Sequence, residues 1–415
     1  MKKLFFLTTF ISVMAVVEMP ATAGKPPPVF SIISDDGVSQ LSFYLALQFR
    51  WEYEYLEREP GQDHATRNEI MIRRIRPVIK GSLFFEDLTY LLHVSLVPGA
   101  LELMDLWFEY RFHPSYQVRV GLAKVPFTRY RLNSFQTRPL VDWSYPTHYF
   151  GAERQFGATL HNGISNPGCF EYELGVYSGV NSRTANGIGM SKIYAEQIAS
   201  PSDLADPDAA MFTNMHTEFV AHLAYNSSDM NVKLPTDFEG GPIRYSLGLS
   251  LAWDLKPTPR QDMRLRLAPE IEIKAHGFAA TAVFYMGFTD HQMDGTEYSL
   301  GAIGGVLQLS YLFFEKYELA VRYTSVHIMD ELRDDARQYA NVQINKASDA
   351  ARVELIDQYA QVGQLENDHE ISLGFNWYLF GTTFKWQVDS GLLMHNRIDG
   401  IRYDVRLRTQ FQLAF

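Results

Sequence analysis

Apolar and polar residues alternate one by one along many stretches of this chain. The end of the chain gives the clearest case, because Ile401, Tyr403 and Val405 alternate with Arg402 and Asp404. Successive side chains of a β-strand point to opposite faces, so this pattern predicts strands with one apolar and one ionic face. Strands of a closed membrane barrel carry the same pattern, with apolar residues toward lipid and polar residues toward the lumen.

Dividing the whole chain on this pattern predicts sixteen strands. They are 41–54, 67–82, 87–97, 101–112, 116–124, 154–162, 169–178, 213–225, 243–254, 263–276, 278–289, 298–312, 317–328, 368–380, 382–395 and 401–415. An even number of antiparallel strands closes with both termini on one side. In hydrocarbon an open sheet edge would leave unpaired backbone groups, each of which costs several kcal/mol. We therefore expect an all-β fold, a closed antiparallel transmembrane β-barrel of about 16 strands.

The connections between these strands fall into two classes. Those on the side of the termini are short, and only 226–242 is long for a periplasmic turn. The connections on the opposite side include the longest ones, among them 125–153, 179–212 and 329–367. Short turns on one side and long loops on the other are typical of an outer-membrane barrel.

The first residues have the character of a secretory signal. Lys2 and Lys3 precede an apolar run from Leu4 to Val17, and small residues follow at 21–23. We expect residues 1–23 to be a signal peptide, 24–40 a periplasmic tether and 41–415 the barrel domain. The alternative is a membrane-anchoring helix, but the apolar run is short for a span. No later stretch holds enough consecutive apolar residues for a transmembrane helix, and the expected location is the bacterial outer membrane.

Composition narrows the possible partners. The chain of 415 residues has 37 basic and 48 acidic residues and a net charge of -11, which argues against nucleic acid as a partner. Cys169 is the single cysteine, so an intramolecular disulfide is excluded. The histidines lack the paired spacing of metal ligands, and we expect neither a metal site nor a cofactor.

The connection 125–153 has a charge balance opposite to that of the whole chain. Together with its flanking residues it contains the basic residues Lys124, Arg129, Arg131, Arg138 and Arg154. The acidic residues are Asp142 and Glu153, so the stretch carries +3 (five minus two). The segment also contains seven aromatic residues, which an exposed loop would not normally carry. We expect it to fold toward the lumen, where its five basic residues form an anion-favouring constriction.

A different arrangement of the same residues is open at this point. The arginines could pair with carboxylates of the barrel wall or contact a neighbouring subunit. The candidate wall carboxylates are Asp105, Glu109, Glu171 and Glu173.

Four segments resemble motifs of the phosphate-selective porin O and P family. Gly121–Phe127 (GLAKVPF) is similar to its G-x-x-K-x-P-F segment, and Phe150–Gly157 (FGAERQFG) resembles its F-G-x-x-R-x-x-G segment. Ile72–Arg76 is similar to its basic second strand, and Leu373–Tyr378 to a motif of its penultimate hairpin. The resemblance implies a sixteen-stranded, usually trimeric outer-membrane channel through which small solutes diffuse.

Phosphate-specific members of that family use a lumenal arginine ladder and a lysine cluster. The candidate wall charges here are Arg402, Arg406, Arg408, Arg264, Arg266, Arg73, Arg74 and Arg76. Acidic residues such as Glu270, Glu272 and Asp389 share the same strand faces, so we expect a general or mildly anion-preferring pore. The expected partners are small anions such as phosphate, outer-membrane lipid and lipopolysaccharide, and two further copies of the chain in a homotrimer.

Two other functional classes remain as alternatives to a passive porin. A structural or adhesion barrel would use its long loops to bind surface partners. An outer-membrane lipase would need a nucleophile, and Ser144 near His148 lies in no recognisable nucleophile motif. The acidic connection 329–367, with a short helix expected from Ala347 to Val362, could gather divalent cations or simply be a solvated loop.

Overall fold

The computed structural model describes residues 28–35, 37–57, 64–97, 100–164, 168–179, 217–255, 265–290, 298–330, 365–397 and 400–415. The strands are β1 (Phe30–Ile33), β2 (Gln40–Leu56), β3 (Ala65–Leu83), β4 (Phe85–Val97), β5 (Ala100–His113), β6 (Tyr116–Lys124), β7 (Arg154–His161), β8 (Phe170–Tyr177), β9 (Glu218–Asn226), β10 (Arg244–Asp254), β11 (Leu265–Ala275), β12 (Phe278–Asp290), β13 (Tyr298–Phe313), β14 (Tyr317–Ile328), β15 (Leu365–Phe380), β16 (Phe384–Arg397) and β17 (Gly400–Ala414). The helical elements are α2 (Arg129–Leu132), the 3-10 helix η1 (Phe135–Thr137) and α3 (Tyr145–Phe150).

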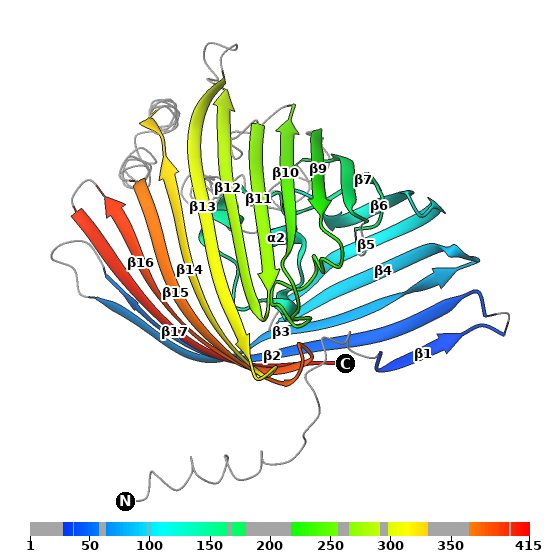
Figure 1. Cartoon of the computed structure of the whole chain (residues 1–415), viewed down its shortest axis with the longest axis horizontal. Coiled ribbons are helices and arrows are strands. Elements are labelled where there is room, and N and C mark those ends of the chain that lie inside the picture. The colour runs from blue at the N-terminus through cyan, green and yellow to red at the C-terminus, as the bar shows by residue number, and fades with distance from the viewer. Residues whose placement is uncertain are drawn as a thin grey trace, which may run out of the picture.

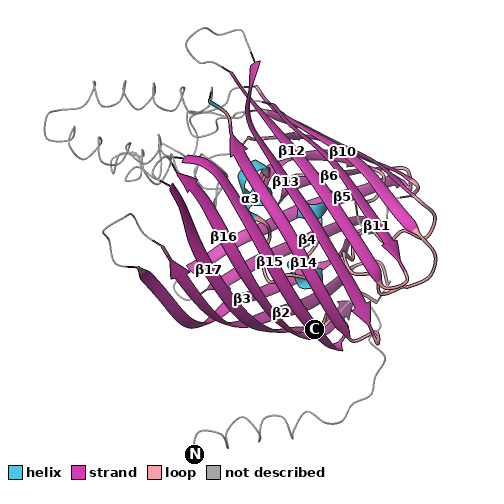
Figure 2. Ribbon diagram, turned by 60° about the vertical axis from the view of Figure 1, so that its left-hand side comes forward, coloured by secondary structure: helices cyan, strands magenta, loops and turns pink. Residues whose placement is uncertain are grey.

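Strands β2 to β17 form a closed antiparallel barrel of sixteen strands, as the alternation predicted (Figure 1). Consecutive strands pair with each other around the barrel, and β17 pairs with β2 from Asp404 opposite Leu56 to Ala414 opposite Ala46. The last pairing closes the sheet, which removes the open edge that lipid could not satisfy. Figure 2 shows the strands wrapped around the short helices.

An extra strand, β1, precedes the barrel and was not predicted within the tether 24–40. It pairs antiparallel with β2, from Phe30 opposite Phe43 to Ile33 opposite Gln40. Strand β17 pairs with β2 only as far as Ala46. Strand β1 therefore pairs with the part of β2 before Ala46, along the edge that β17 leaves unpaired. Phe30 of β1 stacks on Phe43 of β2 with ring centroids 5.3 Å apart, and the Ser31 and Ser42 hydroxyls share a hydrogen bond at 2.8 Å.

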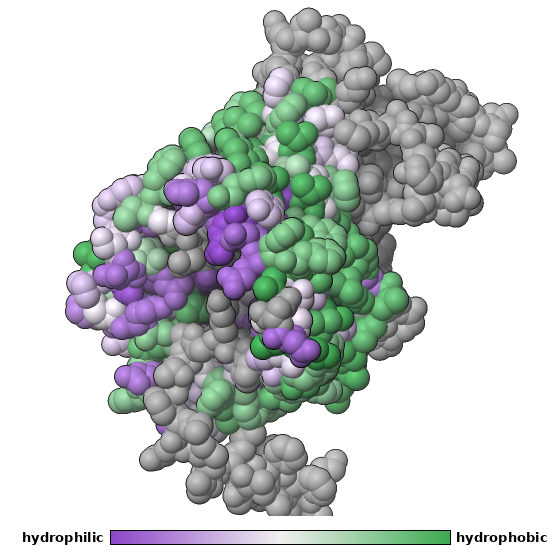
Figure 3. Space-filling view, turned by 90° about the vertical axis from the view of Figure 1, so that its right-hand side faces the viewer, coloured by the Kyte–Doolittle hydropathy of each residue, from purple (hydrophilic) through white to green (hydrophobic). Residues whose placement is uncertain are grey.

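The two faces of the barrel differ as the alternation requires. On β10, Leu247 and Leu249 are exposed on the outside, whereas Ser246 and Ser250 are buried on the inside. Figure 3 shows apolar side chains over much of one side, with hydrophilic side chains gathered in one area of it. The apolar side chains on the outside of the barrel face lipid. Their exposure on the isolated chain therefore does not destabilise the protein.

Several short connections adopt the strained backbone that tight turns require. Phe84, between β3 and β4, has a φ of 60°, and His276 and Gly277, between β11 and β12, have φ values of 51° and 86°. The connection between β9 and β10 differs, because its residues 232, 234 and 235–237 are buried and it is not an exposed turn.

Some expectations lie outside the described residues. These are the signal peptide 1–23, much of the connections 179–212 and 329–367, the helix Ala347–Val362 and the wall residue Arg264. In the described ranges, no helix has the length and apolar character needed to cross a membrane.

Candidate constriction within the barrel

Residues 125–153, which we call the inner segment, form three short helical turns joined by extended residues. Local capping explains where two of these turns begin. The Thr128 hydroxyl accepts a hydrogen bond from the Arg131 backbone N–H at 3.3 Å, and Ser134 does the same for Gln136 at 3.2 Å. A side-chain oxygen before a helix satisfies one of its free N–H groups. The third turn, α3, begins with Pro146 in its first turn, where no N–H is needed.

Wall strands far apart around the barrel hold the inner segment by its backbone. The Asp389 carboxylate on β16 accepts a hydrogen bond from the Val141 N–H at 3.0 Å. The Lys385 ammonium, also on β16, donates to the Arg138 carbonyl at 2.8 Å. Glu270 on β11 accepts from the Arg129 N–H at 2.8 Å. Contacts to β11 and to β16 show that the segment lies across the lumen, and Figure 1 shows α2 within the barrel.

An apolar cluster fixes the second half of the inner segment. The Phe150 ring stacks on Tyr285 of β12 with centroids 5.2 Å apart and ring planes 5° apart. Both side chains are fully buried, together with Phe127 and Tyr149. Burying a Phe-sized side chain stabilises by about 1.5–3 kcal/mol, so the cluster is a sizeable anchor. Gly304 on β13 allows the approach, since a Cβ there would lie 2.5 Å from the Phe150 ring.

The charged centre of the inner segment is Asp142. Its carboxylate accepts hydrogen bonds from Arg50 of β2 at 2.7 Å, Arg74 of β3 at 3.0 Å and Arg408 of β17 at 3.2 Å. Its backbone carbonyl accepts from Arg322 of β14 at 2.9 Å and from Arg138 at 3.2 Å. Hydrogen bonds between charged groups are about twice as strong as neutral ones, so this arginine cluster ties four strands to one loop residue.

The arginine cluster controls ionisation within the inner segment. Burial alone would raise the pKa of Asp142, but the charges of Arg50, Arg74 and Arg408 lower this pKa well below its usual value. Burial lowers the pKa of Arg138 to about 10, and the nearby Tyr130 hydroxyl offsets part of that fall. At neutral pH the Asp142 carboxylate is therefore charged, and it neutralises part of the cluster.

The five basic residues predicted for the constriction are separated by the structure into different environments. The Arg129 guanidinium contacts Glu171 and lies 3.3 Å from Glu173, and the Arg131 guanidinium contacts Glu153. The side chains of Arg129, Arg131 and Arg138 are almost fully buried. For Arg129 the structure thus shows the pairing with wall carboxylates that the sequence had left open.

Lys124 and Arg154 complete the set of predicted constriction residues at the two ends of the inner segment. The Lys124 ammonium donates to the carbonyls of Arg131, Leu132 and Asn133 at 3.0–3.2 Å, so it caps the carboxyl end of α2. The Arg154 guanidinium donates to Asp105 at 2.9 Å and keeps 15 % of its side chain exposed. Three of the predicted constriction arginines pair with carboxylates, namely Arg129, Arg131 and Arg154. Of these, Arg154 is the most accessible to water.

Trp143 brings several of these cations together. The guanidinium carbons of Arg131 and Arg138 each lie 4.5 Å from the centre of its ring system. The Lys124 ammonium lies 5.6 Å away. Cations over an indole face gain about 0.5–2 kcal/mol, which offsets part of the repulsion among like charges.

The predicted wall arginines also have partners. Arg406 donates to Glu370 at 2.8 Å, and Arg408 to Asp389 at 2.7 Å. Arg266 contacts Glu218 and donates to the Phe150 carbonyl at 3.1 Å. The other described wall arginines are Arg74 in the arginine cluster, Arg76 beside the Phe135 ring at 5.9 Å, and the partly exposed Arg73 and Arg402.

Sequence reasoning did not select Arg50, Arg322 and Lys385, although the structure places all three against the inner segment. Each occupies an inward position of an alternating strand, a signal that was present in the sequence. The pattern shows that a residue faces the lumen, but which loop residue it meets depends on where the inner segment crosses.

A second internal segment, residues 227–243, explains the long connection noted on the periplasmic side. The Lys274 ammonium of β11 donates to the Asn231 carbonyl at 2.5 Å, and the Asp237 carboxylate accepts from the Gly277 N–H at 2.8 Å. Phe238 packs edge-on against Tyr378 of β15, with ring centroids 4.9 Å apart. We call residues 227–243 the periplasmic segment. It reaches from β9 to β15 inside the end of the barrel.

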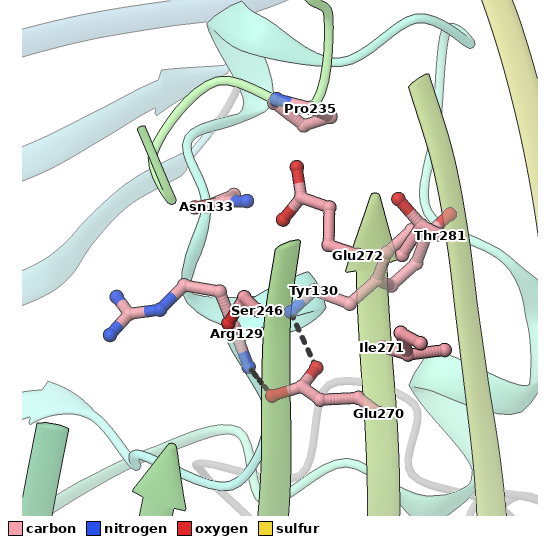
Figure 4. Close-up of a pocket in the computed structure, with 9 residues that line it drawn as sticks. All are labelled: Arg129, Tyr130, Asn133, Pro235, Ser246, Glu270, Ile271, Glu272 and Thr281. Carbon is pink, nitrogen blue, oxygen red and sulfur yellow. Dashed lines mark hydrogen bonds between the residues drawn. The ribbon is translucent and has the colours of Figure 1, made fainter. Parts of the chain in front are cut away.

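The two internal segments approach each other at a small cavity of about 10 Å³ (Figure 4). The inner segment contributes Asn133 and the periplasmic segment contributes Pro235, with Glu272 of β11 beside both. Figure 4 also shows the Glu270 carboxylate accepting hydrogen bonds from the backbone N–H groups of Arg129 and Tyr130. This cavity has room for about one water molecule, so the segments fill this part of the lumen closely.

The remaining candidate chemistry has structural partners. The Ser144 hydroxyl shares a hydrogen bond with Thr147 at 2.6 Å, and His148 lies 3.7 Å from Glu153. Among the described residues, no group of three or more histidine, cysteine or acidic side chains has a geometry that could hold a metal ion.

Comparison with known proteins supports the family resemblance. Residues 43–206 match the family described as phosphate-selective porin O and P. Comparison with curated proteins gave no match.

Solved structures show the same fold. The outer membrane channel DcaP of Acinetobacter baumannii is 11% identical with a TM-score of 0.54, over 92% of this chain and 99% of that chain. The anion-selective porin from Comamonas acidovorans is 11% identical with a TM-score of 0.53, over 91% of this chain and 100% of that chain. OprB of Pseudomonas putida is 11% identical with a TM-score of 0.53, over 90% of this chain and 94% of that chain. At this identity the similarity concerns the fold.

Proposed function

We propose that this outer-membrane porin, whose match to the phosphate-selective porin O and P family covers residues 43–206, prefers small anions. One observation carries the proposal: the inner segment lies across the lumen, and together with its flanking residues Lys124 and Arg154 it has five basic and two acidic residues in a chain that is acidic as a whole. In a narrow pore with low-dielectric walls, such a local charge excess attracts anions more strongly than it would in open water.

The buried arginines and the accessible ones have different roles in this proposal. Arg129, Arg131 and Arg138 hold the inner segment and contribute to the field at a distance, because their side chains are buried. Arg154 keeps part of its guanidinium exposed beside Asp105 and meets the solute. Phosphate is one small anion of the right chemistry, since guanidinium groups bind its oxygens in pairs. An anion-selective porin has the same fold.

The proposal is tested by the reversal potential of the purified protein in a planar lipid bilayer under a potassium chloride gradient. We expect a potential of the sign that chloride permeation produces, and a smaller one for Arg154→Gln. Lys316→Gln is the matched control, because Lys316 lies in the short turn between β13 and β14. A reversal potential at zero or of the opposite sign for the unmodified protein would contradict the anion preference.

The proposal extends to assembly and to phosphate. The family resemblance supports a homotrimer embedded in lipid and lipopolysaccharide, and light scattering of the detergent-purified protein measures its mass. Adding inorganic phosphate to the chloride solution distinguishes a phosphate-preferring pore from a general one. A phosphate-preferring pore loses chloride current at low phosphate concentration, whereas a general pore does not.

A further inference from the structure

Inward-facing side chains are not equally covered around the barrel. On β8 to β17 many of them are fully buried, for example Glu173, Arg322 and Gln410, each with an exposure of 0%. On β3 to β6 several are partly exposed instead. These partly exposed inward residues are Arg76, Val78, Lys80, Leu91, His93, Trp107, Glu109 and Arg119.

The two internal segments account for this difference. The inner segment packs against Glu270 of β11 and Asp389 of β16, and the periplasmic segment against Lys274 of β11 and Tyr378 of β15. These four contacts lie on β11, β15 and β16, and other contacts of the inner segment reach β8 through Arg129 and β2, β3 and β17 through Asp142. Among the described residues, the part of the wall formed by β3 to β6 keeps several inward side chains that water reaches.

Cations lie at intervals along this exposed part of the wall. Arg76 and Lys80 are four residues apart on β3, which corresponds to about 13 Å along a strand. Arg119 follows on β6, where it pairs with Glu109 at 2.6 Å and keeps 14% of its side chain exposed. Arg154 joins the group from the start of β7 through Asp105.

Aromatic rings beneath these cations hold them in place. The Lys80 ammonium lies 4.1 Å from the centre of the Tyr44 ring, and the Arg119 guanidinium lies 4.1 Å from the centre of Trp107. A cation held against a ring loses side-chain freedom but keeps its charge, so it presents a fixed point of positive potential. The exposed wall thus combines fixed cations with small apolar surfaces.

We infer that solutes cross the barrel along the wall formed by β3 to β6, and that Lys80 and Arg119 are residues that a passing anion meets. This inference rests on the proposed porin function and specifies the route and the residues within it. Neither residue was among those that the sequence selected for the pore. The solutes are small anions, because the cations along this wall attract them, and a carboxylate such as Glu109, which pairs with Arg119, limits tight binding.

The route is tested by chemical modification of introduced cysteines in the full-length protein. Cys169 is exposed and is first replaced, by Cys169→Ser. Lys80→Cys and Arg119→Cys are then made singly in this background, with Ser250→Cys as the control. Ser250 faces the lumen from β10 but is fully buried beside His222, at 2.8 Å. Each variant is inserted into a planar bilayer and treated with a negatively charged thiosulfonate reagent.

We expect the reagent to cause a stepwise loss of single-channel conductance for Lys80→Cys and Arg119→Cys, and none for Ser250→Cys. A positively charged reagent of the same size should block current as well, but should leave the anion preference closer to that of the parent. If one of the two variants forms no channels, the other makes the same test alone.

Reaction at Ser250→Cys without reaction at positions 80 and 119 would overturn the proposed route. That result is distinct from a failure of the porin proposal, because the reversal potential of the unmodified protein is measured in the same bilayers. A preserved anion preference with unreactive wall cysteines rejects only the route. A lost preference in the parent protein rejects the proposed function.

Discussion

The Arg50 guanidinium of β2 donates to the Asp142 carboxylate at 2.7 Å, which joins the wall of the barrel to the middle of the inner segment. Arg74 and Arg408 reach the same carboxylate, so three strands next to the closure of the barrel share one counterion. Loss of the Asp142 carboxylate should destabilise this site, because three guanidinium groups would then face each other where little water reaches them.

Asp142→Asn removes the negative charge while keeping the shape of the side chain. We expect a loss of about 3 kcal/mol in the free energy of unfolding, because Arg74 would lose its carboxylate partner, whereas Arg50 keeps Glu52 and Arg408 keeps Asp389. The measurement is urea unfolding in lipid vesicles, followed by tryptophan fluorescence. Asp229→Asn is the control, since Asp229 is exposed in the connection between β9 and β10. An equal loss for both variants would show that the arginine cluster is not an anchor.

The ionisation of the Asp142 carboxylate also makes the stability of the barrel depend on pH in the acid range. Its pKa in the folded protein lies below the usual value of about 3.9, so folding favours the charged form. That stabilisation is complete above about pH 4 and is lost as the pH falls through the lowered pKa. We expect the difference in thermal midpoint between the parent and Asp142→Asn to be constant from pH 7 to pH 5 and to shrink below pH 4. A difference that already shrinks between pH 7 and pH 5 would contradict the lowered pKa.

Gly304 and Gly305 give a matched pair for the apolar anchor of the inner segment. A Cβ on Gly304 would lie 2.5 Å from the Phe150 ring, whereas a Cβ on Gly305 would have no atom closer than 3.8 Å. Gly304→Ala should therefore displace Phe150 and cost about 1–3 kcal/mol, the usual penalty of overpacking. Gly305→Ala should have little effect. Thermal unfolding monitored by circular dichroism compares the two, and similar midpoints would contradict the contact.

Asp237 holds the periplasmic segment through Arg244 of β10 and the Gly277 N–H. Asp237→Asn should loosen residues 227–243 and raise the single-channel conductance, because the segment occupies the end of the lumen. Asp229→Asn again serves as the control, in the same connection. Conductance traces in planar bilayers decide the outcome, and an unchanged conductance with a normally folded variant would show that the segment does not narrow the passage.

The alternation of residues was sufficient to predict sixteen strands and their antiparallel closure. The boundaries agree closely, and 116–124 and 317–328 coincide with β6 and β14. Strands that follow each other in the sequence also pair with each other in such a barrel, so the strand order needs no information beyond the strand positions. The short strand β1 was missed, because residues 30–33 show no clear alternation.

Charge and aromatic content along the chain also indicated that residues 125–153 pack against other parts of the protein. The partners of Arg129, by contrast, depended on where the segment crosses the lumen, and Glu171 and Glu173 are far from it in sequence. The sequence by itself determined the barrel, because the period of two and the need to pair every amide in lipid leave one solution. Only the tertiary structure decided which cations are buried and which face water, since that depends on the two segments that fill one part of the lumen.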